Sequence, residues 1–80
     1  MNQQDAHSAV HHAIGQVAPE IEPEDLQGDA RLRQDLELDS LDFLRLVEVI
    51  AATTGVHIPE SDYPRVATVQ GLADYVAAHG

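Results

Sequence analysis

Residues 35–54 read DLELDSLDFLRLVEVIAATT, and this stretch decides the fold. At about 100° per residue its apolar side chains recur on one face of a helix over about 39–54, which predicts a buried stripe. The stripe consists of Phe43, Leu46, Val47 and Ile50. Asp39 or Ser40 can cap the first turn, with Asp42 completing a capping box, and Gly55 suits the residue after the last turn. The chain is therefore predicted to fold around an amphipathic helix.

The opposite face of this helix mixes leucines with charged side chains. Either the long segment before the helix covers this face, or the face is a docking surface for a partner. Nine of the fourteen acidic residues lie between Glu20 and Asp42 and lead to the helix start, which would steer a basic partner to that point. The predicted partner-binding residues are Asp39, Leu41, Asp42, Leu44, Arg45 and Glu48.

Ser40 at the helix start allows two interpretations. It can be a simple helix cap, or its hydroxyl can carry a phosphate, because free N–H groups and the helix dipole stabilise an anion there. Asp39 and Asp42 would repel a free phosphate. A covalent phosphodiester is less affected, since it carries one charge and cannot dissociate.

Outside this stretch, helical periodicity predicts three more segments. A helix over about 2–17 has Asn2 as its N-cap, and its apolar stripe contains Val10 and Ile14. A short helix over about 61–66 would hold Pro64 in its first turn, and a helix over about 68–78 begins at Thr68. The last helix places Val69, Leu72, Ala73 and Val76 on one face. Residues 18–38 are predicted to be a loop held by Ile21, Leu26, Leu32 and Leu36. The prediction is an all-α, four-helix bundle with a short third helix, forming one domain over 1–80.

Composition excludes several classes of function. With 14 Asp and Glu, 4 Arg and no Lys, the net charge is −10, so neither nucleic acid nor an anionic membrane surface is an expected partner. There is no Cys for a disulfide, a zinc site or a thiol nucleophile. No signal peptide and no apolar run of spanning length is recognisable. We therefore expect a soluble, cytoplasmic monomer without membrane insertion.

Other site chemistries find little support. Asp35, Glu37 and Asp39 resemble the start of an EF-hand loop, but the later Gly and Glu are missing. His7 and His11 share a helical face without a convergent third ligand, so no metal site is expected. Ser40 lacks a nucleophile elbow, and no Gly-rich phosphate loop is present. The chain is therefore not expected to be an enzyme.

Residues 35–42 resemble the phosphopantetheine-attachment motif of acyl carrier proteins. The resemblance continues through Phe43 to Ala52, Val56 to Pro59, and Ala67 to Val76. It implies a four-helix bundle in which Ser40 carries a 4′-phosphopantetheine arm that a separate transferase takes from coenzyme A. The arm's thiol would hold an acyl group as a thioester, which suits a chain without Cys. The implied partners are the phosphopantetheinyl transferase and acyl-loading and acyl-transfer enzymes with basic docking patches.

The chain departs from the family pattern near the motif. Glu37 stands where the family often has Gly, and Arg45 and Glu48 stand where it has an acidic and an apolar docking residue. Residues 51–54, Ala-Ala-Thr-Thr, lack the acidic run of fatty-acid-synthesis members. These differences favour a specialised lipid, polyketide or aminoacyl pathway over housekeeping fatty-acid enzymes, while Asp39 favours an acyl over a peptidyl carrier. The alternative is a non-enzymatic protein-binding helical module in which Ser40 is only a helix cap.

Overall fold

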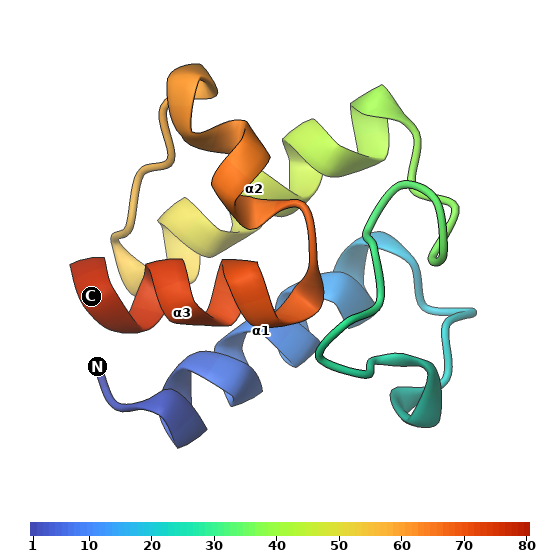
Figure 1. Ribbon diagram of the computed structural model, residues 1–80, viewed down its shortest axis with the longest axis horizontal. Helices are drawn as coiled ribbons and strands as arrows, with labels where there is room; N and C mark the ends of the chain where they lie inside the picture. Colours follow the sequence, from blue (N-terminus) through green and yellow to red (C-terminus); the bar gives the residue numbers. More distant parts are fainter.

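Three α-helices and a seven-residue 3₁₀ helix form the bundle in the computed structural model, which describes residues 1–80 (Figure 1). The elements follow the order α1 (Gln3–Val17), η1 (Pro23–Asp25), α2 (Ser40–Thr54), η2 (Glu60–Val66) and α3 (Val69–His79). There is no strand, and a single isolated bridge joins Arg31 to Thr68. The all-α prediction of a four-helix bundle with a short third helix is confirmed.

The helices begin and end at residues whose side chains or backbone suit those positions. Asn2 Oδ1 accepts a hydrogen bond from the backbone N–H of Asp5 at 2.7 Å, which caps α1. Thr68 Oγ1 caps α3 by accepting from the N–H of Gly71 at 2.9 Å. Gly55 ends α2 in the left-handed region, at a φ of 76°. Each of the three α-helices starts within one residue of its predicted first residue, because N-caps are local signals.

The core lies where α1 packs against both α2 and α3. The predicted stripes supply most of its fully enclosed side chains, which include Val10, Ile14, Leu46, Ile50, Val69, Leu72 and Val76. One member of the α2 stripe is less buried than predicted, because Val47 packs against the core but is only half-buried. Val47 is at the edge of the apolar arc, so it meets the core with one side only.

The long connection between α1 and α2 is held by apolar side chains and contains a helical turn. Leu32 and Leu36 are buried as predicted, whereas Ile21 and Leu26 are only partly buried against the core. The loop was not predicted to contain a helix, but η1 occupies Pro23–Asp25. A single 3₁₀ turn has no apolar periodicity that would reveal it in the sequence.

The segment η2 is a 3₁₀ helix, and Pro64 is its fifth residue rather than a member of its first turn. That part of the prediction was wrong, because seven 3₁₀ residues replace the single turn that was expected. The buried Tyr75 of α3 holds η2 by donating its hydroxyl to Asp62 Oδ2 at 2.7 Å. This hydrogen bond raises the pKa of Tyr75, because the ionised phenol would face the carboxylate. Arg65 lies over the Tyr75 ring, with its guanidinium carbon 5.3 Å from the centroid.

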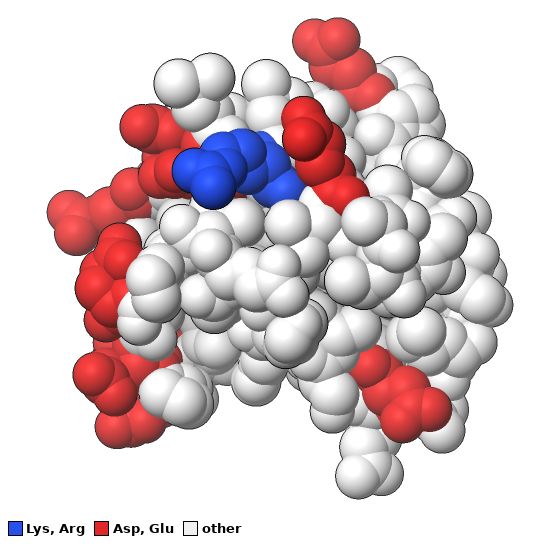
Figure 2. Space-filling view, turned by 180° about the vertical axis from the view of Figure 1, so that it is seen from behind, with Lys and Arg blue, Asp and Glu red and all other residues white.

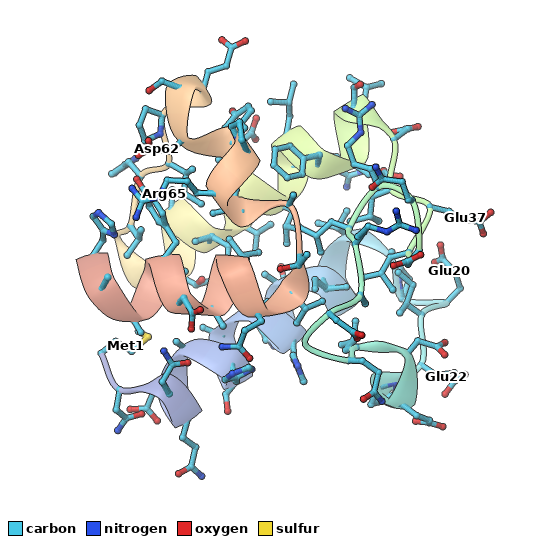
Figure 3. The ribbon with its side chains drawn as sticks, viewed as in Figure 1. Met1, Glu20, Glu22, Glu37, Asp62 and Arg65 are labelled. Atoms are coloured by element: carbon cyan, nitrogen blue, oxygen red, sulfur yellow. The ribbon has the colours of Figure 1, made fainter.

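None of the helices combines the length and the apolar character needed to cross a membrane. Asp62 and Arg65 lie together on η2, on the side of the molecule away from the long loop (Figure 3). The two termini are adjacent, since the amino group of Met1 donates to the carbonyl of Gly80 at 3.1 Å. The start of α2 and the long loop lie on the side of the bundle opposite the termini (Figure 1).

Candidate functional site

Ser40 is the first residue of α2, and its side chain is exposed. The N-cap is Asp39, whose Oδ1 accepts from the backbone N–H of Asp42 at 2.8 Å. The preceding Leu38 is buried and fixes the entry of the chain into the helix. The capping role that the alternative function assigns to Ser40 therefore belongs to Asp39. The Ser40 hydroxyl is left available at the positive end of a fifteen-residue helix.

One side chain from the long loop contacts this hydroxyl. Arg33 Nη2 donates to Ser40 Oγ at 3.1 Å, although seven residues separate the two in the sequence. Reasoning from the sequence did not find this residue, because no helical or strand period relates a loop residue to the first residue of the next helix. Its only signal was that Arg33 is one of two cations within an acidic stretch.

The loop reaches this position through backbone hydrogen bonds on either side of Arg33. The N–H of Leu32 donates to the carbonyl of Ala67 at 2.9 Å, and the N–H of Leu38 donates to the carbonyl of Leu32 at 3.2 Å. Arg31 and Asp35 form an ion pair at 3.2 Å. The hydrogen bonds from Arg31 lower the pKa of Asp35, since they favour its charged form.

Between Leu36 and Leu38 the backbone turns sharply. Glu37 has a φ of 58°, and it is the one non-glycine residue with a positive φ. This is the position at which the sequence has Glu where acyl carrier proteins often have Gly. The left-handed conformation explains a glycine preference there, because a Cβ atom makes this conformation unfavourable.

The predicted docking residues are spread over the first turns of α2. Leu41 is 71% exposed and Leu44 is 43% exposed, so the long loop does not cover them. Arg45 and Glu48 are also exposed, while Asp42 is partly buried. The hypothesis that the loop covers this face is therefore wrong for both leucines. Leu41 and Leu44 are three residues apart and therefore neighbours on the helix surface, so they form a contiguous exposed apolar pair, as expected of an interaction surface.

Two hollows adjoin the start of α2. An open groove of about 830 Å³ lies between the loop and α2. Its acidic lining residues are Glu20, Glu24, Asp25, Asp35, Glu37 and Asp42. The labelled Glu20, Glu22 and Glu37 all lie on the loop side of the molecule (Figure 3). A smaller pocket of about 250 Å³ is lined by Arg33, Phe43 and Tyr63, among others.

Charge is unevenly distributed over the rest of the surface as well. On the face seen from behind, most acidic side chains lie at the edges, and cationic atoms occupy one small area with acidic atoms directly beside it (Figure 2). Together with the net charge of −10, this excess of acidic side chains favours basic partner surfaces.

The histidines of α1 do not contribute to this site. His7 and His11 lie edge to face, with their ring centroids 6.1 Å apart. Burial and the nearby His7 lower the pKa of His11, whose Nε2 is enclosed without a hydrogen-bond partner. Nowhere does the structure bring three His, Cys, Asp or Glu side chains together as metal ligands.

The residues at the start of α2 fit a phosphodiester-linked group. The linking oxygen would come from an exposed hydroxyl with no capping role, and the helix N-terminus and Arg33 both favour negative charge there.

Comparisons with known proteins agree with this geometry. A family model described as "Phosphopantetheine attachment site" matches residues 9–76. The chain is 32% identical over 59 residues to a protein of Rubrobacter xylanophilus named "Acyl carrier protein", covering 74% of this chain and 73% of that protein. It is also 32% identical over 59 residues to an "Acyl carrier protein" of Lactobacillus johnsonii, covering 74% of each chain.

Proposed function

Because the chain belongs to the acyl carrier protein family, whose members bear a covalent 4′-phosphopantetheine, we propose that Ser40 is the attachment residue and that the chain carries acyl groups as thioesters. The observation that carries the proposal is the exposed Ser40 hydroxyl at the start of α2, with capping performed by Asp39 instead. The thiol of the arm supplies the thioester bond, and the chain itself catalyses no reaction in this proposal.

The roles of the chain's own residues follow from their positions. Ser40 Oγ forms the bond to the phosphorus on the pantetheine side of coenzyme A while the pyrophosphate P–O bond breaks. Adenosine 3′,5′-bisphosphate leaves, and the proton of Ser40 passes to a base of the transferase. The N-terminus of α2 then stabilises the charge of the diester. Leu38, buried beneath this point, keeps the attachment residue at a fixed place on the bundle.

We further propose that the exposed face of α2 is read by the enzymes that load and unload the arm. Its members are Asp39, Leu41, Asp42, Leu44, Arg45 and Glu48. The support comes from the exposed leucines and from the adjoining acidic groove, which match partners with basic docking patches. Arg45 and Glu48 favour a dedicated partner set, as in a specialised lipid, polyketide or aminoacyl pathway. Cytoplasmic location stays a prediction.

The attachment is tested by intact-mass measurement. The protein is incubated with coenzyme A and a promiscuous phosphopantetheinyl transferase, and a mass gain of one phosphopantetheine group is expected. Ser40→Ala should abolish the gain, because it removes the linking oxygen. Ser61→Ala is the matched control, since Ser61 is another exposed serine near the start of a helical element, and it should keep the gain.

Circular dichroism of each variant shows whether the bundle is intact. The attachment proposal fails if folded wild-type protein gains no mass, or if the gain persists in Ser40→Ala.

A further inference from the structure

The contact between Arg33 and Ser40 also matters for the protein once Ser40 is modified. Arg33 is exposed, yet its Nη2 lies 3.1 Å from the oxygen that would link the arm. Arginine donates several N–H groups in one plane, which matches the oxygens of a phosphate better than it matches a single hydroxyl. A phosphodiester bonded to this oxygen would bring better acceptors to the same guanidinium.

The backbone of Leu32, directly before Arg33, is fixed, so the side chain of Arg33 starts from a defined place. Leu32 is fully buried, and its N–H donates to Ala67 while its carbonyl accepts from Leu38. This arrangement lowers the conformational entropy lost when Arg33 binds, since only the side chain has to be ordered.

No other arginine is as well placed. Arg31 is paired with Asp35, and Arg65 lies over the Tyr75 ring. Arg45 follows Ser40 by five residues, which is about 140° around the helix. Asp39 and Asp42 flank Ser40, so a diester there adds negative charge to an acidic site. A cation that contacts the linking oxygen offsets this repulsion.

We infer that Arg33 is a positioning residue that binds the phosphodiester oxygens of the arm once Ser40 is modified. This inference rests on the proposed attachment at Ser40. Arg33 also lines the pocket of about 250 Å³ that contains Phe43 and Tyr63. By binding the diester, Arg33 therefore holds the first atoms of the arm beside that pocket.

The test compares apo and fully modified protein in wild type, Arg33→Gln and Arg31→Gln. Arg31→Gln is the control because it removes the same charge from the same loop, two residues away, without touching Ser40. It also removes the ion pair with Asp35, but that loss is present both before and after modification and cancels in the comparison. Modification should shift the thermal midpoints of wild type and Arg31→Gln upward relative to the shift seen in Arg33→Gln. The expected difference between these shifts is about 2 °C. This difference should disappear in 0.5 M salt, which screens an exposed pair.

Phosphorus NMR of the modified proteins gives a second readout. The ³¹P resonance should move towards that of a free phosphodiester and sharpen in Arg33→Gln, but not in Arg31→Gln. Identical ³¹P spectra and identical apo-to-modified midpoint changes in all three proteins would overturn the inference while leaving attachment at Ser40 intact. Wild-type protein that gains no mass would overturn the proposed function and this inference together.

Discussion

The loop around Glu37 imposes an unfavourable backbone conformation on this single residue. The chain must turn between the buried Leu36 and Leu38, and it does so with Glu37 at a φ of 58°. A residue with a Cβ atom pays about 1–2 kcal/mol for this conformation, while glycine does not. The loop before Ser40 is therefore held under local backbone strain.

Glu37→Gly should raise the free energy of unfolding by about 0.5–1 kcal/mol. The relief of strain is partly offset by the greater entropy that glycine gives the unfolded chain. Urea unfolding followed by circular dichroism measures the change. Glu22→Gly is the control, because Glu22 is exposed, has a φ of −78°, and loses the same charge. It should lower stability instead, and an equal loss in both variants would contradict the assigned strain.

At the scale of elements, α2 has one face buried in the core and another exposed to solvent. Phe43, Leu46 and Ile50 join it to the core, whereas Leu41 and Leu44 remain in solvent. Its neighbour η2 is attached through Phe43, whose ring meets Tyr63 edge to face with centroids 5.0 Å apart. The proposed docking face therefore lies on a helix whose opposite side is fixed to the core and to η2.

Asp42→Lys should slow modification by the transferase about tenfold at low salt, because a reversed charge opposes steering of a basic partner. Asp5→Lys is the matched control. Asp5 and Asp42 are each the third residue of their helix and each donates its backbone N–H to the cap, so both variants lose the same favourable interaction with the helix dipole.

Initial rates at 20 mM and 500 mM salt give the measurement for both variants. The defect of Asp42→Lys should shrink at high salt, while Asp5→Lys should stay near the wild-type rate. A defect independent of salt, or an equal defect in both variants, would count against electrostatic docking at α2.

For the whole molecule, the net charge of −10 acts against compaction. The acids are concentrated between Glu20 and Asp42, and one ion pair, Arg31 with Asp35, offsets them in the structure. Mutual repulsion of these carboxylates therefore destabilises the folded state more than the unfolded one, in which they lie farther apart.

Raising salt from 10 mM to 500 mM should increase the thermal midpoint by about 5 °C, because ions screen this repulsion. A variant with Glu20, Glu22 and Glu24 all changed to Gln should start with a higher midpoint at low salt and gain less from added salt. Differential scanning calorimetry measures both proteins. A midpoint that falls with salt would show that favourable ion pairs outweigh the repulsion.

Periodicity and caps allowed the helices to be predicted, since both signals involve residues within a few positions of one another. The stripe of Phe43, Leu46 and Ile50 and the caps Asn2 and Thr68 are such local features. The 3₁₀ form of η2 depended on packing against other elements, whereas the partial burial of Val47 follows from its place at the edge of the apolar arc. Local sequence patterns therefore did not reveal the 3₁₀ form of η2.

At the candidate site the same division holds. The sequence by itself was enough to identify the candidate serine, its acidic neighbours and the amphipathic helix that follows, because these residues are contiguous. Only the tertiary structure decided that Asp39 is the cap, that Leu41 and Leu44 stay exposed, and that Arg33 reaches Ser40. The path of the loop sets the contact of Arg33, and that path is determined by buried leucines and by the hydrogen bond from Leu32 to Ala67, which is distant in the chain.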